Sequence, residues 1–151
     1  MTISRICSAA LLVAAAGFGV SACDESLADL AGPTPTLQPT FSSIQTNIFD
    51  NGDSSGRPAC TSCHNAVGSR FSGGLNLTEA VSYASLVNAA SSGKPGAVRV
   101  IPGDGTNSYL IHKLEGRSGI VGLRMPTSGP YLTAGQIAII QTWIANGARN
   151  D

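Results

Sequence analysis

The sequence predicts an all-α domain, and three observations lead to this prediction. Apolar residues recur at helical spacing in four segments, over residues 41–49, 76–89, 108–115 and 133–147. Most of these segments have a capping residue at the start or a glycine at the end. No segment alternates apolar and polar residues for long enough to form a sheet. The 151 residues are enough for one domain with one core.

The first two predicted helices are recognised from their starts. The helix over residues 41–49 follows a proline and has Thr40 as its N-cap. The helix over residues 76–89 opens on Asn76, with Glu79 three positions later in a capping arrangement. The apolar residues available for burial are Phe41, Ile44, Ile48, Val81, Ala84, Leu86 and Val87.

The third and fourth predicted helices have signals at both ends. Asn107 is the expected cap of the third helix, and Gly116 is its stop. The last helix carries the clearest signals, because Thr133 and Gln136 form a capping box and Gly147 ends the segment. A tryptophan beside the isoleucine stripe of this helix, Trp143, is expected first of all to be part of the core.

Residues 1–22 are typical of a secretory signal peptide. Arg5 gives a positive start, and an apolar run from Ile6 to Val20 is followed by small residues. The run is too short to cross a bilayer comfortably, so a permanent transmembrane helix is disfavoured. Removing this segment would leave a net charge of about −1, since the whole chain is neutral and Arg5 is its one charge in the leader.

The four residues Val20-Ser21-Ala22-Cys23 resemble the lipobox of bacterial lipoproteins. This interpretation makes Cys23 an acylated N-terminus, whereas ordinary cleavage after Ala22 is the alternative. Residues 23–40 are rich in proline and threonine and lack an apolar period, which predicts an extended tether ahead of a domain over 41–151. The expected location is the bacterial cell envelope, facing the periplasm and anchored to the membrane by lipid.

The charge pattern excludes some partners. The charged fraction is 12%, no basic stripe favours nucleic acid, and no acidic run suggests a basic partner. The 18 glycines suit a loop-rich domain around a large apolar cofactor.

The motif Cys60-Thr61-Ser62-Cys63-His64 has the spacing C-x-x-C-H, which is the attachment signature of c-type haem. Thiols three positions apart lie on one face of a helical turn, where they can form thioethers with the two vinyl groups of one porphyrin. The adjacent His64 would supply an axial ligand to the iron. The motif therefore predicts one covalently bound haem c.

Other chemistry for this motif is disfavoured by what the rest of the chain lacks. A structural zinc site needs two more ligands at knuckle spacing, but the mature chain offers only one other cysteine, Cys23, and one other histidine, His112. A dithiol redox motif does not need the trailing histidine and usually lies near a βαβ pattern. A disulfide between Cys60 and Cys63 would close a small, strained ring.

The sixth iron ligand separates electron carriers from catalysts. Met125 is the one methionine of the mature chain and lies in a loop, where its thioether would favour ferrous iron. His112 and an open position are the alternatives. Side chains that could bind haem propionates, although each is more often an ordinary solvated residue, are Arg99, Arg124, Tyr109 and Tyr131.

These motifs together resemble class I cytochrome c, and most of all the cytochrome-c-like domains of planctomycetes and related bacteria. The resemblance covers residues 41–148 and departs from the family pattern at Gly105 and at residues 127–129. The segments that carry it are, in chain order, 60–64, 73–77, 102–104, 108–110, 124–126 and 132–148.

The resemblance implies a small helical domain wrapped around one haem, with His64 and Met125 as axial ligands. It implies a one-electron carrier rather than an enzyme, one that meets redox partner proteins of the cell envelope and has no small-molecule substrate. The alternatives are a peroxidase-like haem enzyme and a haem-based sensor whose Met125 ligand is displaceable.

Overall fold

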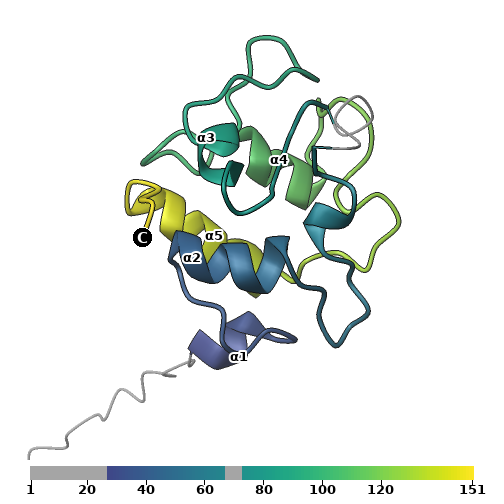
Figure 1. The fold of residues 1–151 in the computed structure, drawn as a ribbon, viewed down its shortest axis with the longest axis vertical. Helices are drawn as coiled ribbons and strands as arrows, with labels where there is room; N and C mark the ends of the chain where they lie inside the picture. Colours follow the sequence, from purple (N-terminus) through teal and green to yellow (C-terminus); the bar gives the residue numbers. More distant parts are fainter. Residues whose placement is uncertain (1–26, 67–72) are drawn as a thin grey trace, which may run out of the picture.

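The computed structural model describes residues 27–66 and 73–151, and within them the chain is helical without a β-strand. The all-α prediction is confirmed for this part of the chain, where the only β-structure is three isolated bridges. The helices, shown in Figure 1, are α1 (Leu27–Ala31), α2 (Phe41–Ile44), the π-helical η1 (Gln45–Phe49), the 3₁₀ turn η2 (Cys60–Ser62), α3 (Ser82–Leu86), α4 (Tyr109–Glu115) and α5 (Ala134–Ala145).

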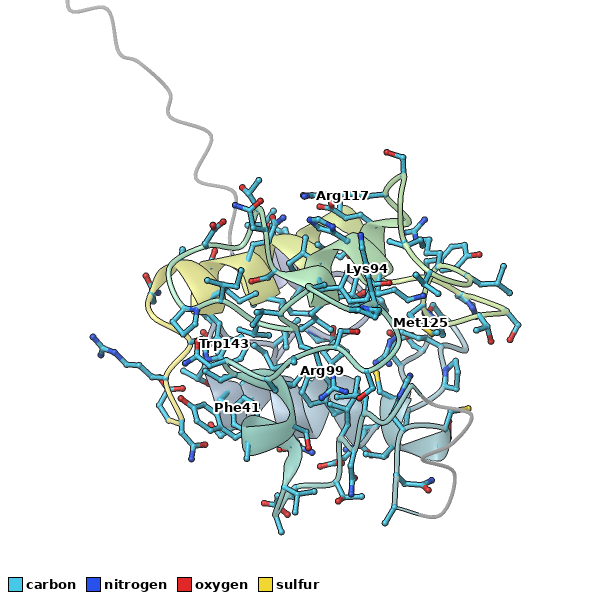
Figure 2. All side chains as sticks on the ribbon, turned by 90° about the horizontal axis from the view of Figure 1, so that it is seen from above. Phe41, Lys94, Arg99, Arg117, Met125 and Trp143 are labelled. Carbon is cyan, nitrogen blue, oxygen red and sulfur yellow. The ribbon has the colours of Figure 1, made fainter. Side chains whose placement is uncertain are left out.

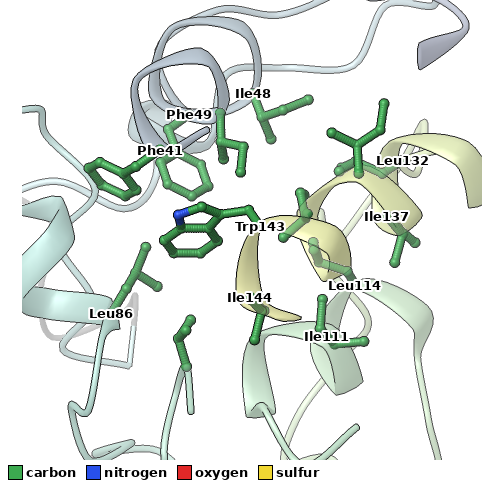
Figure 3. Packing of buried hydrophobic residues seen from close by; sticks show 14 of the residues in the cluster. Phe41, Ile48, Phe49, Leu86, Ile111, Leu114, Leu132, Ile137, Trp143 and Ile144 are labelled. Carbon is green, nitrogen blue, oxygen red and sulfur yellow. The ribbon is translucent and has the colours of Figure 1, made fainter. Parts of the chain in front are cut away.

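Helix α5 is the centre of the molecule, with α1 and α2 on one side of it and α3 and α4 on the other (Figure 1). The predicted capping box is present, since the Gln136 amide donates to Thr133 Oγ1 and the Thr133 amide donates to Gln136 Oε1. Trp143 is 1% exposed and packs on Phe41 with ring centroids 5.5 Å apart, so its core role is confirmed (Figure 3).

The predicted helix over residues 41–49 is confirmed as a continuous run of α2 and η1. Thr40 is its N-cap, and the Thr40 hydroxyl accepts from the Ser43 amide at 3.3 Å. The second half is wound as a π-helix, in which the Asp50 amide donates to the Gln45 carbonyl at 2.9 Å. π-Helical turns of this kind often occur beside functional sites.

Both ends predicted for the helix over residues 76–89 are wrong. The Asn76 side chain accepts from the Thr78 amide at 3.0 Å in a local turn, so helix α3 begins only at Ser82. Helix α3 ends at Leu86 because the chain then pairs with a distant segment, and Asn88 donates its amide to the Val100 carbonyl at 2.9 Å. The local apolar spacing carries no information about that pairing.

Helix α4 begins at Tyr109, and the predicted Asn107 cap is wrong. The Asn107 side chain bonds Asp104, while the Ser108 hydroxyl donates to the Asp104 carbonyl at 2.7 Å. The predicted stop is confirmed, because Gly116 adopts the left-handed conformation with φ of 72° at the end of the helix.

The extended tether predicted over residues 23–40 is wrong for its described part, residues 27–40. Helix α1 packs on α5, and Ala31 and Leu37 are fully buried in the core. The approach is so close that a Cβ on Gly135 would lie 1.9 Å from the Leu30 carbonyl oxygen. A few apolar residues among the prolines are enough to dock this segment, so the folded domain begins before Phe41.

The expected signal peptide, residues 1–22, and Cys23 lie outside the described residues. Within residues 27–66 and 73–151, no helix combines the length and the apolar character needed to cross a bilayer.

Candidate functional site

The residues proposed from the sequence meet at one cavity of about 800 Å³. Cys60, Cys63, His64 and Met125 all line it, together with Arg99 (Met125 and Arg99 are labelled in Figure 2). Its walls come from η1, η2, residues 73–77, helix α4 and the loop that follows α4. A volume of this size lies in the range of about 300–1,000 Å³ that is typical of pockets for small molecules and cofactors.

The motif itself forms a tight turn. The amides of Cys63 and His64 both donate to the Cys60 carbonyl, at 3.2 and 2.9 Å. This turn brings both thiols and the imidazole to the same cavity, with Cys60 half-buried, Cys63 exposed and His64 Nδ1 buried. The structure therefore places both thiols and the imidazole of one short turn at the same cavity.

The motif is fastened to the end of η1 by its own side chains. The Cys60 thiol donates to the Ile48 carbonyl at 3.2 Å, and the Thr61 hydroxyl donates to the Phe49 carbonyl at 3.0 Å. Burial raises the pKa of the Cys60 thiol to about 11, so this group is neutral at pH 7. A dithiol redox site usually has a thiol whose pKa is lowered, and the pKa of Cys60 changes in the opposite direction.

Arg57 also holds the motif against η1, and this role was not recognised from the sequence. Arg57 is 2% exposed, and its guanidinium, which has five N–H groups, makes five hydrogen bonds. The acceptors are the Asp53 carboxylate and the carbonyls of Asn47, Ile48, Asn51 and Pro58. Arg57 thus ties the last turn of η1 to the residues that lead into the motif.

The Asp53–Arg57 ion pair is buried on both sides, with each side chain 1% exposed. Burial alone raises the pKa of Asp53, but hydrogen bonds from Ser55, Arg57 and Gln136 outweigh it and hold the pKa below its ordinary value. The folded-state pKa is therefore below the unfolded-state pKa. The stability from Asp53 is present above a pH of about 4 and is lost as the pH falls through the folded-state pKa.

Replacing Arg57 with methionine should lower the free energy of unfolding by about 3–5 kcal/mol, because Asp53 would keep a buried charge without its partner. Urea unfolding of the purified protein, followed by circular dichroism, measures this change. The matched control is Arg149→Met, since Arg149 is exposed. A loss below about 1 kcal/mol for Arg57→Met, no larger than that of an exposed ion pair, would contradict the role of Arg57 as a clamp.

Met125 lies half-buried between the core and the cavity, in the loop that follows α4. Its amide donates to the Lys113 carbonyl at 2.9 Å, which fixes the loop to α4 at the residue that carries the thioether. The alternative ligand His112 points elsewhere, since its Nε2 lies 2.7 Å from the Thr106 carbonyl oxygen and the residue does not line the cavity. Of the two side chains proposed from the sequence for the sixth position, Met125 lines the cavity of the motif and His112 does not.

Arg99 is a buried cation at the cavity wall. Its Nη1 donates to the Ser85 carbonyl at 2.8 Å, and its Nη2 donates to the Gly74 carbonyl at 3.2 Å. Burial lowers the pKa of Arg99. Among the described residues, no carboxylate forms an ion pair with Arg99, and its hydrogen-bond acceptors there are backbone carbonyls and the Ser92 hydroxyl.

The other residues expected near propionates have different positions. Arg124 donates to the Leu114 carbonyl at 2.7 Å and lies over the Tyr131 ring, 4.0 Å from its centroid. Tyr109 lines the cavity, and its hydroxyl accepts from the Val121 amide at 2.9 Å. Arg99 is therefore the best placed of these residues for a negatively charged group of a ligand.

The cavity does not have the features of a structural metal site. In the part of the chain that the structure describes, no group of three or more histidine, cysteine, aspartate or glutamate side chains is placed to hold a metal ion. A closed zinc site needs four such ligands around the metal. The donors that do reach this cavity are two thiols, one imidazole and one thioether.

Comparisons with known proteins give no match: no family model, no curated protein and no solved structure is significantly similar to this chain. The geometry of the site and the sequence motifs therefore carry the functional argument.

Proposed function

We propose that this protein is a monohaem c-type cytochrome that carries one electron at a time in the bacterial cell envelope. The observation that carries the proposal is the shared cavity of Cys60, Cys63, His64 and Met125. The first three come from one turn, and Met125 comes from a loop more than 60 residues further along the chain. Nothing in the sequence spacing requires the fold to bring that loop to the motif.

The residues present fit a covalently held haem c. Cys60 and Cys63 would form the thioethers, while His64 and Met125 would bind the iron. When bound, the haem would supply an iron centre that takes up and releases a single electron. Leucines of four different segments, among them Leu75, Leu86 and Leu132, would exclude water from its faces.

The charge on the cavity wall also fits this cofactor. A buried guanidinium is stabilised by an anionic partner, and the porphyrin carries two propionate carboxylates. Arg99 lines the cavity and has carbonyl oxygens, but no described carboxylate, around it. We therefore place a propionate at Arg99 as part of the proposal.

Met125 favours a carrier over a catalyst. A haem enzyme or a gas sensor needs an iron position that an exogenous ligand can occupy, whereas a carrier keeps both protein ligands in both oxidation states. No small-molecule substrate is needed, and transient contact with redox partner proteins is enough. Val121 and Leu123, which are 54% and 64% exposed at the cavity mouth, offer a small apolar surface for such contact.

An optical spectrum of the purified protein, with and without carbon monoxide, tests the proposed function. The reduced wild type should show the spectrum of a low-spin c-type haem, and carbon monoxide should leave that spectrum unchanged. Rapid binding of carbon monoxide would instead support a peroxidase-like enzyme or a sensor.

We further propose that Cys23 is the acylated N-terminus and anchors the domain to a membrane. Since α1 begins at Leu27, only three residues separate Cys23 from the described domain. A fully extended chain over that stretch spans at most about 14 Å. The domain would therefore lie close to the membrane surface, rather than at the end of the long tether expected from the sequence.

Cys23→Ala should release the protein from the membrane fraction in soluble form, because several acyl chains on one cysteine are needed for a stable anchor. Intact mass of the wild type from the membrane fraction should show a lipid-modified Cys23. Cys7→Ala is the matched control, since Cys7 lies in the expected signal peptide and should leave the mature protein unchanged. An unmodified N-terminus at residue 23 or later would refute the anchor.

A further inference from the structure

The loop that carries Met125 has no regular structure of its own. From Gly116 to Thr133 the chain forms neither helix nor strand. The position of the Met125 thioether therefore depends on contacts with other segments, and several of these come from helix α4, which ends at Glu115.

Lys113 of helix α4 holds this loop in two ways. Its backbone carbonyl accepts from the Met125 amide at 2.9 Å. Its ammonium group donates to the Val121 carbonyl at 2.8 Å and to the Leu123 carbonyl. A single residue thus binds the loop at Met125 itself and at the second and fourth residues before it.

Neighbouring contacts act on the same loop at other points. The Tyr109 hydroxyl accepts from the Val121 amide at 2.9 Å, and Arg124 donates to the Leu114 carbonyl at 2.7 Å. Lys94 donates to the Gly119 carbonyl at 2.8 Å, six residues before Met125. Lys113 differs from Lys94 because its ammonium binds two carbonyls, both close to Met125.

We propose that Lys113 is a positioning residue for Met125, whose ammonium group holds the loop so that the thioether stays at the cavity. This inference rests on the proposed function, in which Met125 is an axial ligand. Lys113 also lines the cavity, but in this role it acts on the loop and not on a reacting atom. It acts through the carbonyls of Val121 and Leu123.

In this role, Lys113 shifts an equilibrium between two conformations of the loop. In one conformation Met125 is bound to the iron, and in the other Met125 has left it. Hydrogen bonds from a charged donor contribute more than neutral ones, but the two from the Lys113 ammonium are exposed, which reduces their contribution. Losing both should raise the population of the Met125-off form about tenfold. An exogenous ligand that needs this form should then bind about tenfold more tightly.

Imidazole binding to the ferric holoprotein measures this population. Lys113→Met keeps the aliphatic stem and removes the ammonium, and it should bind imidazole about tenfold more tightly than the wild type. Lys94→Met is the matched control and should change the affinity by less than about threefold. Lys113→Arg, which keeps the charge, should restore most of the wild-type affinity, whereas a merely structural loss of packing would not be rescued by charge.

The outcomes separate this inference from the proposed function. A thioether bound to ferric iron gives a weak sulfur-to-iron charge-transfer band in the near infrared. If the wild type shows this band but Lys113→Met and Lys94→Met bind imidazole with equal affinity, the role of Lys113 is overturned and the proposed function stands. If the wild type lacks that band and Met125→Ala binds imidazole as the wild type does, both are overturned. Should Lys113→Met fail to fold, Lys113→Gln supplies the same comparison with a polar, uncharged side chain.

Discussion

The double variant Cys60→Ser, Cys63→Ser is expected to yield almost no haem-containing protein. A serine hydroxyl occupies nearly the same space as a thiol, but it does not form the thioether to a porphyrin vinyl group. Cys63 lines the cavity and is exposed, so burial alone would hold a cofactor weakly there. The measurement is the haem content per chain of protein purified from cells that attach haem c.

Two controls make this result specific. Ser62→Ala changes the same turn, where the Ser62 hydroxyl donates to the Ala59 carbonyl at 2.6 Å, and it should keep its haem. Each single cysteine variant should retain one thioether and therefore part of the haem content. If the double variant were purified with one tightly held haem per chain, the proposed covalent attachment would be wrong.

Met125→Ala is expected to convert the carrier into a protein that binds exogenous ligands. Without the thioether, the ferric spectrum should lose its sulfur-to-iron band and become high-spin, and the ferrous form should bind carbon monoxide readily. Met125→His should keep two protein ligands but lower the reduction potential, because imidazole favours ferric iron more than a thioether does. For a one-electron couple, each 59 mV is a tenfold change in the equilibrium with the electron donor.

Leu123→Ala is the matched control, because Leu123 lies two residues away in the same loop and its side chain is exposed. It should leave the band and the carbon monoxide reactivity as they are in the wild type. If Met125→Ala keeps the band and the potential of the wild type, Met125 is not a ligand. His112→Ala is then the next variant to measure, although His112 lies against the Thr106 carbonyl.

The features that were predicted correctly are those encoded within a few residues. The capping box of α5, the Thr40 cap of the first helix and the Gly116 stop are all local signals, and all are present. Met125 and the motif line the same cavity although they are far apart in the sequence. The sequence could suggest it only because few other residues are able to bind the iron.

The features that were missed depend on distant contacts. Docking of α1 uses Ala31 and Leu37, which are too few to give an apolar period among prolines. Arg57 and Lys113 bind mainly backbone carbonyls, and every residue has a carbonyl, so no sequence pattern marks the partner. For Arg57, the only signal in the sequence was an arginine just before the motif, and this signal is weak.

The most direct test of the central claim is the intact mass of the purified protein under denaturing conditions. The account predicts the mass of the mature chain plus one haem, which stays with the chain after acid–acetone extraction, and plus acyl groups if Cys23 is lipidated. A chain without haem, from cells that attach haem to a known c-type cytochrome in parallel, would contradict the account. Release of free haem by the extraction would contradict it equally, because the Cys60 and Cys63 thioethers would then be absent.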